Sequence, residues 1–115
     1  MAGKCFIMFK NHHESLNSFS RIVKSVPLSE GLMYLFLPKV DHNCVRLTDI
    51  AMEKFNLIHF CEVPEWKDVD TTISRLISHL KGTDVFIYLP EWLPSETKRR
   101  LRELSEFHNF TIVSA

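Results

Sequence analysis

The feature that most constrains the fold is a regular alternation between two kinds of apolar pattern along the whole chain. Five short runs of aromatic and branched residues predict buried strands, and between them apolar residues recur every three or four positions, as in helices. A proline directly follows the second, third and fourth runs, which indicates that each of those strands ends there. The strands are expected at residues 4–9, 32–37, 57–63, 84–89 and 110–113.

Apolar spacing also predicts the helices between these strands. Helices are expected over residues 16–26 and 69–80, and a shorter one over 47–55 after a polar loop at 39–46. Ser95 is expected to cap the last helix, because a serine hydroxyl can accept from the free backbone N–H groups at a helix start. Three apolar residues are expected on one side of that helix: Leu101, Leu104 and Phe107.

Strands and helices therefore alternate in the order βαβαβαβαβ. Strands that are apolar on both faces indicate a parallel sheet covered by helices on both sides. With right-handed crossovers, such a chain forms a three-layer Rossmann-like or flavodoxin-like domain. A length of 115 residues is enough for one domain with a substantial core. We therefore predict a single α/β domain over residues 1–115, with a five-stranded, mostly parallel sheet.

Charge and cysteine content exclude several classes of protein. Fourteen Lys and Arg balance fourteen Asp and Glu, so the chain lacks the basic excess that bulk binding to nucleic acid needs, and we do not expect DNA binding. No apolar run approaches the roughly 18 residues of a membrane span. Three cysteines without a CxxC spacing fit free thiols in a reducing compartment, which predicts a cytoplasmic protein. Zero net charge also weakens self-repulsion, and we expect a homodimer.

Polar residues after the first two strands are the first candidates for a site, because open parallel sheets bind ligands outside the carboxyl ends of their strands. His12 and His13 are the predicted catalytic residues, since adjacent imidazoles can transfer protons or contact phosphate near neutral pH. A solvated loop pair with no partner is the alternative interpretation. The predicted ligand-binding residues in these loops are Lys10, Asn11, Asp41 and His42.

A repeated tetrapeptide marks the two later strand-to-helix loops. Val63-Pro64-Glu65-Trp66 follows the third strand, and Leu89-Pro90-Glu91-Trp92 follows the fourth. One interpretation is structural, because a Trp before a helix can pack onto the first turns of that helix. The other interpretation is a pair of aromatic platforms that flank a ligand at the carboxyl edge of the sheet.

Familiar signatures of catalysis are missing from the sequence. It contains no GxGxxG, GxxxxGK[ST], GxSxG or HExxH, and no third metal ligand at a recognisable spacing from His12 and His13. We therefore predict neither a cofactor nor a bound metal. The basic cluster at residues 98–102 is interleaved with glutamates, and pairs such as Arg99–Glu103 indicate a solvated, salt-bridged helix face.

The C-terminal half contains, in order, Trp66, Asp84, Leu89-Pro90, Trp92 and Ser95. In this order and approximate spacing it resembles the nucleoside 2-deoxyribosyltransferase-like family. The resemblance implies a Rossmann-like fold and a nucleoside or nucleotide ligand, with Asp84, Trp92 and Ser95 in the ligand-binding wall. It also implies cleavage of an N-glycosidic bond, although the position of the nucleophilic Glu of that family falls near Leu101 here.

The turn at Asn11-His12 is similar to the polar Asn-His turn after the first strand of some small CRISPR-associated Rossmann-like proteins. That resemblance implies binding or cleavage of cyclic oligoadenylates. We therefore predict a nucleotide- or nucleoside-binding protein that, if it is an enzyme, hydrolyses a glycosidic or phosphodiester bond. The alternative is a non-catalytic, homodimeric interaction module, which the missing motifs and the aromatic content favour.

Overall fold

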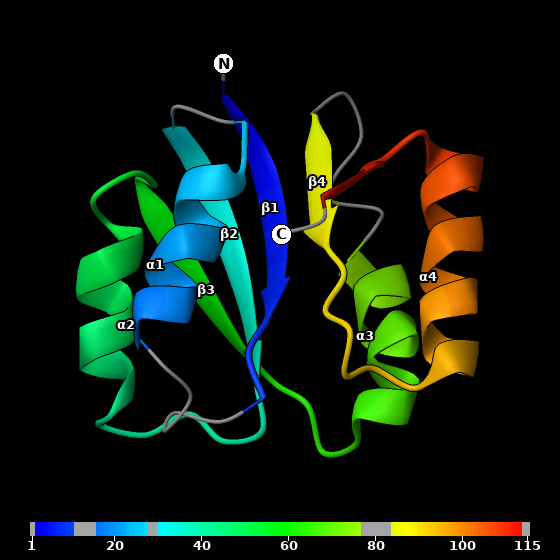
Figure 1. Ribbon diagram of the computed structural model, residues 1–115, viewed down its shortest axis with the longest axis horizontal. Coiled ribbons are helices and arrows are strands. Elements are labelled where there is room, and N and C mark those ends of the chain that lie inside the picture. The colour runs from blue at the N-terminus through cyan, green and yellow to red at the C-terminus, as the bar shows by residue number, and fades with distance from the viewer. Residues whose placement is uncertain (1, 11–15, 28–29, 77–83, 114–115) are drawn as a thin grey trace.

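All five predicted strands form, and they join one parallel sheet flanked by four helices (Figure 1). The computed structural model describes residues 2–10, 16–27, 30–76 and 84–113. The strands are β1 (Ala2–Met8), β2 (Glu30–Leu37), β3 (Leu57–Glu62), β4 (Val85–Tyr88) and β5 (Thr111–Val113). The helices are α1 (Leu16–Ser25), α2 (Cys44–Ala51), α3 (Val69–Leu76) and α4 (Ser95–His108), with a short 3-10 helix η1 (Trp66–Asp68) before α3.

The strands lie in the order β3-β2-β1-β4-β5, and every neighbouring pair is parallel. This is the order of the first five strands of a Rossmann sheet, so the strand order is Rossmann-like rather than flavodoxin-like. β1 takes the centre because its side chains are apolar on both faces: Cys5, Phe6 and Ile7 are all 0% exposed. A strand of that kind is stable only with neighbours on both sides and helices above and below.

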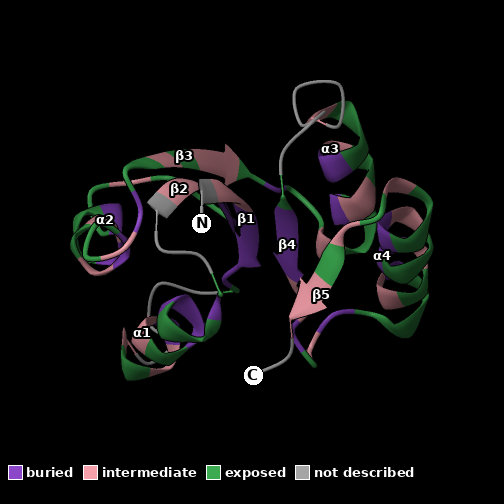
Figure 2. Ribbon diagram, turned by 90° about the horizontal axis from the view of Figure 1, so that it is seen from above, coloured by how far each residue is buried: buried purple, intermediate pink, exposed green. Residues whose placement is uncertain are grey.

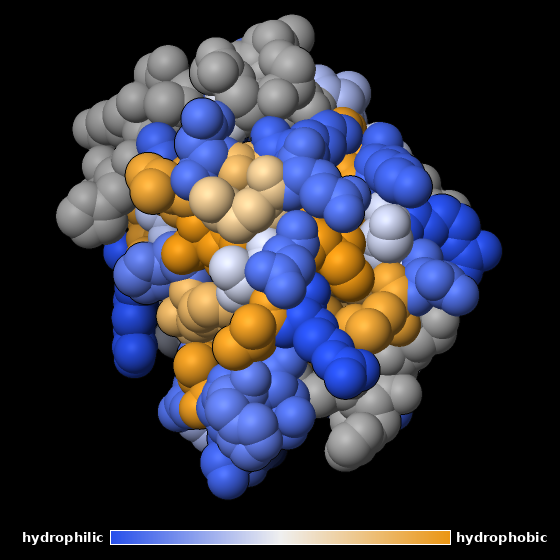
Figure 3. Space-filling model, turned by 90° about the vertical axis from the view of Figure 1, so that its left-hand side faces the viewer, coloured by the Kyte–Doolittle hydropathy of each residue, from blue (hydrophilic) through white to orange (hydrophobic). Residues whose placement is uncertain are grey.

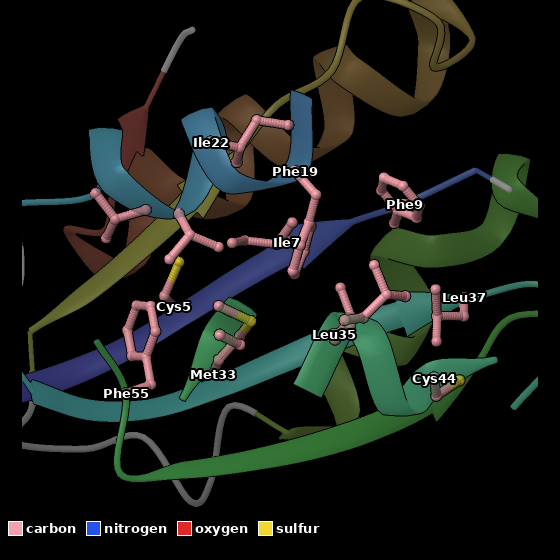
Figure 4. Packing of buried hydrophobic residues seen from close by; sticks show 14 of the residues in the cluster. Cys5, Ile7, Phe9, Phe19, Ile22, Met33, Leu35, Leu37, Cys44 and Phe55 are labelled. Atoms are coloured by element: carbon pink, nitrogen blue, oxygen red, sulfur yellow. The ribbon is translucent and has the colours of Figure 1, made fainter. Parts of the chain in front are cut away.

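Two apolar cores lie on opposite faces of the sheet, because alternate side chains of a strand point to opposite sides. Cys5 and Ile7 of β1, and Phe9 just after it, face α1 and α2. The centroids of the Phe9 and Phe19 rings lie 5.3 Å apart (Figure 4). Phe6 and Met8 face α3 and α4 in the other core. Figure 2 shows the resulting three layers, with the buried sides of the helices turned towards the strands.

Gly31 allows the starts of β1 and β2 to approach closely. Its φ of +134° is rare for a residue with a side chain, and a Cβ there would lie 2.1 Å from the carbonyl oxygen of Gly3. Asn56 fixes the same point from the other side. Its Oδ1 accepts from the Gly31 backbone N–H at 3.0 Å, and its own N–H donates to the Gly31 carbonyl at 2.9 Å, which aligns β3 with β2.

Three local predictions need correction. The short helix α2 begins at Cys44 inside the expected polar loop, because Cys44, Leu47 and Ala51 lie on one face and are buried together. Ser95 does not cap α4: Pro94 occupies the cap position, and Ser95 is already the first helical residue. Phe107 was expected on the same side of α4 as Leu101 but is 84% exposed. The buried residues of α4 recur every four positions, and Phe107 is not one of them. The buried residues are Thr97, Leu101 and Ser105.

Two further predictions concern the cysteines and membrane spans. Cys5, Cys44 and Cys61 are free thiols, as their spacing predicted. Within the described ranges, each helix is too short or too polar to cross a membrane.

Candidate functional site

The strand order creates one switch point, between β1 and β4. After β1 the chain continues to β2 on one side, whereas after β4 it continues to β5 on the other side. In open α/β sheets ligands bind at such a point, outside the carboxyl ends of the strands. The described segments that leave the sheet there are Phe9–Lys10 after β1 and the second Pro-Glu-Trp segment after β4.

The two tryptophans of the chain meet at this edge. The ring centroids of Trp66 and Trp92 lie 4.9 Å apart at an angle of 73°, an edge-to-face contact. Both rings are half-buried and pack against the core under α3 and α4. The repeated Pro-Glu-Trp segments therefore bring two aromatic rings together, each with part of its surface open to solvent.

Contacts between η1 and α4 hold these rings in position. The carbonyl oxygen of Lys67, next to Trp66, accepts from Thr97 Oγ1 at 2.8 Å and from Arg100 Nη2 at 2.6 Å. Arg100 also pairs with Asp70 of α3, with Nε and Oδ2 3.0 Å apart. Thr97 is almost fully buried, whereas the Arg100 bond to the same carbonyl is exposed.

Lys10 places a positive charge beside the aromatic pair. Its Nζ lies 5.8 Å from the centroid of the Trp92 ring, within the range of a cation–π contact. The side chain is otherwise exposed. A cation next to two accessible rings can bind a planar aromatic group by stacking and an adjacent phosphate by charge.

The glutamates that precede the two tryptophans, Glu65 and Glu91, are both exposed. Glu65 forms an exposed ion pair with Lys67 at 3.3 Å. Glu91 is exposed, and its backbone carbonyl accepts from Lys98 Nζ at 3.2 Å.

Asp41 and His42 follow β2, on the far side of β1 from Trp92. Asp41 Oδ1 accepts from the Asn43 backbone N–H at 2.9 Å, and the Asp41 carbonyl accepts from Cys44 at 3.1 Å. These bonds start α2, which covers the opposite face of the sheet from the tryptophans. Asp41 therefore has a structural role at the start of α2, while the His42 side chain is exposed.

The remaining predicted site residues separate into three groups. Asp84 directly precedes β4, at the amino edge of the sheet, and its carbonyl accepts from the Lys4 N–H at 2.8 Å. The length of β4 therefore separates it from the carboxyl edge, where the family resemblance implied a ligand wall. Ser95 lies at the carboxyl edge, at the start of α4, three residues after Trp92. Three predicted residues lie outside the described part of the chain: Asn11, His12 and His13.

Two further features that the sequence singled out are the Cys61 thiol and the charged face of α4. Burial raises the pKa of the Cys61 thiol to about 11, so it stays protonated and is a poor nucleophile near neutral pH. Arg99 pairs with Glu96 and Glu103, which confirms the salt-bridged face predicted for α4. Among the side chains that the structure describes, no three His, Cys, Asp or Glu come together as a metal site requires.

A shallow hollow lies away from this edge, between α1 and α2. Its volume is about 260 Å³, and its lining includes Ser20, Lys24, Glu53 and Lys54. The Lys54 ammonium is committed to backbone carbonyls at the end of α1. We therefore assign this hollow to the packing of the two helices, and the switch point remains the better candidate for a ligand.

Sequence reasoning offered a pairing of Trp66 and Trp92 only as one of two interpretations, and it did not predict that Lys10 lies beside Trp92. The repeated Pro-Glu-Trp pattern was the available signal for the first. No local signal reports the second, because the two residues are 82 positions apart in the sequence. The comparisons add no family: no family model, curated protein or solved structure matches the chain.

Proposed function

We propose that the chain binds a nucleotide or nucleoside at the switch point between β1 and β4. The observation that carries the proposal is the group formed by Lys10, Trp92 and Trp66 at the carboxyl edge. A base stacked on an accessible indole contributes about 1–3 kcal/mol, whichever base it is. The Lys10 ammonium lies 5.8 Å from the centroid of the Trp92 ring and supplies the positive charge that a phosphate needs.

Two features of the surroundings support this class of ligand over a metal or a dinucleotide cofactor. Hydrogen bonds from Thr97 and Arg100 to the Lys67 carbonyl hold the backbone beside Trp66, so little conformational freedom is lost when a ligand binds. The loop after β1 lacks the glycines that let a backbone wrap closely around a pyrophosphate. A single base with one phosphate, or a short oligonucleotide, fits a cation and two rings better.

Hydrolysis is a further step of the same proposal. His12 and His13 follow Lys10 by two and three residues in the sequence, between β1 and α1. In phosphodiester hydrolysis, one imidazole would take a proton from the attacking water while the other protonates the departing oxygen. In glycosidic hydrolysis, the same acid would protonate the leaving base.

The test is a thermal-shift screen of the full chain against nucleosides, mono- and dinucleotides and cyclic oligonucleotides. A ligand at about 100 times its dissociation constant should stabilise the fold by about 2.7 kcal/mol, a rise of several degrees. A flat screen at millimolar ligand would overturn the proposal.

Variants then locate the site. Trp92→Ala should weaken binding about 5- to 150-fold, the equivalent of one lost stacking contact. Lys10→Met should weaken binding of phosphorylated ligands and leave the nucleoside unaffected. Lys24→Met is the matched control, because Lys24 is an exposed lysine of α1. If a ligand binds and both site variants retain wild-type affinity, the site is elsewhere. Turnover by wild type but not by His12→Ala or His13→Ala tests hydrolysis separately.

A further inference from the structure

The edge strand β3 carries little of the usual protection against pairing, because Glu62 at its end is its one charged residue. β3 pairs with β2 on one side only, and it is six residues long. Exposed edges are normally protected by short strands, lysines, prolines or bulges. The edge β5 is short, with three residues, whereas β3 has no charge or proline from Leu57 to Cys61. β3 is therefore the edge on which another strand can add.

Exposed apolar side chains gather around the same edge. Within the described residues, five large apolar side chains are exposed, and four of them belong to the segment from residue 40 to residue 57. Figure 3 views this side of the molecule and shows apolar surface across its middle, bordered and interrupted by polar residues. The four residues are Val40, Val45, Met52 and Leu57. The fifth, Phe107, lies on α4 at the other end of the strand order.

We propose that a second copy of this chain covers this surface, with the two β3 strands antiparallel about a two-fold axis. A two-fold axis through His59 places Ile58 opposite Phe60 of the second copy, and Leu57 opposite Cys61. Apolar residues then face apolar residues on both sides of the joined sheet. Glu62 falls opposite Asn56, so no like charges meet; an axis through Phe60 would instead set Glu62 against Ile58.

Charge favours a second copy over a different protein. The chain has no net charge, so two copies do not repel each other as a whole. The exposed side of α2 carries Val45 and Met52 together with the opposite charges Arg46 and Asp49. The same axis brings the two α2 helices to one face of the joined sheet in antiparallel order. Arg46 and Asp49 give this exposed surface charges of both signs, so a two-fold axis can bring opposite charges of the two copies together.

This interface does not depend on the proposed ligand, because it includes none of Lys10, Trp66 and Trp92. The first test is the molar mass of the full chain by light scattering at tens of micromolar. We expect twice the chain mass of 13.5 kDa, and a mass of 13.5 kDa for Leu57→Lys. Phe107→Lys is the matched control, because it also places a lysine at an exposed apolar position. Phe107 is 84% exposed and Leu57 is 65% exposed, and the Phe107→Lys variant should stay dimeric.

The second test is a cross-link at the axis. Residues directly opposite each other in antiparallel strands have Cα atoms about 4.5–5.5 Å apart, which suits a disulfide. His59→Cys with Cys61→Ser should form a disulfide-linked dimer under mild oxidation. A monomeric wild type would overturn the proposal and leave the edge for a different protein. A dimer that survives Leu57→Lys, or that Phe107→Lys dissociates, would overturn it too. A dimer without the His59→Cys cross-link would overturn the axis through His59.

Discussion

Lys54 holds the end of α1, and its removal should cost measurable stability. The last carbonyl groups of a helix have no partner within it. The Lys54 ammonium donates to the carbonyl oxygens of Val23 at 3.0 Å and Lys24 at 3.4 Å, and also to that of Val26. Ser25 completes the cap, because its hydroxyl donates to the Ile22 carbonyl at 2.7 Å. One lysine thus satisfies the end of a helix about 30 residues before it in the chain.

The expected loss follows from these bonds. Hydrogen bonds that involve a charged group contribute about 1.5–3 kcal/mol, and a cation at a helix C-terminus adds about 0.3–1 kcal/mol. Two effects reduce this gain. First, partial burial lowers the pKa of Lys54, because desolvation disfavours the charged ammonium and so offsets part of the stabilisation by its hydrogen bonds. Second, the carbonyl groups that the variant frees can bind water. We expect Lys54→Met, which keeps the apolar stem, to lower the free energy of unfolding by about 2 kcal/mol.

Urea unfolding followed by tryptophan fluorescence and circular dichroism measures this change, which corresponds to a fall of roughly 8 °C in melting temperature. Lys24→Met is the control, because Lys24 lines the same hollow but is exposed. It should change the free energy of unfolding by less than about 0.5 kcal/mol. Equal losses in the two variants would refute the assignment of the cap to Lys54.

Two further predictions concern the central strands. Gly31→Ala should cost at least about 3 kcal/mol in urea unfolding, because its Cβ would meet the Gly3 carbonyl at 2.1 Å and φ is +134°; an unchanged midpoint would contradict the close approach of β1 and β2. Burial raises the pKa of the Cys5 thiol from 9.0 to about 12, so on raising the pH this thiol ionises in the unfolded chain before it does in the folded one. The free energy of unfolding should therefore fall above about pH 9, and the loss should reach roughly 2–3 kcal/mol at about pH 11. Cys5→Val should flatten that alkaline slope, and identical slopes for the two proteins would show that Cys5 is not the cause.

Sequence patterns predicted the fold well because each strand and helix carries its own signal. The apolar run of β1 and the prolines after β2, β3 and β4 report local conformation directly. The boundaries that failed were those set by partners distant in the sequence. Cys44 was assigned to a loop because its polar neighbours dominate, whereas burial against the core makes it helical. Phe107 follows a helical spacing from Leu101 and Leu104, but α4 turns a different stripe towards the sheet.

The candidate site was predicted less completely, for a related reason. The edge itself follows from the alternation of strands and helices, and Trp92 was identified from its place after β4. The contact of Lys10 with Trp92 depends on β1 lying next to β4, and strand adjacency is not written in the sequence. Asp84 is the opposite case. The family resemblance predicted it in the ligand wall, but it precedes β4 and therefore lies at the amino edge of the sheet.

The most direct test of the central claim uses the two indole N–H signals of the chain in a ¹⁵N-labelled sample. Because Trp66 and Trp92 are the only tryptophans, these signals report on the proposed site alone, and Trp66→Phe and Trp92→Phe assign them. Titration with the nucleotide or nucleoside that shifts the melting temperature most should move both signals along one saturation curve. Saturable binding of that ligand with both indole signals unmoved would contradict a ligand site at the switch point between β1 and β4.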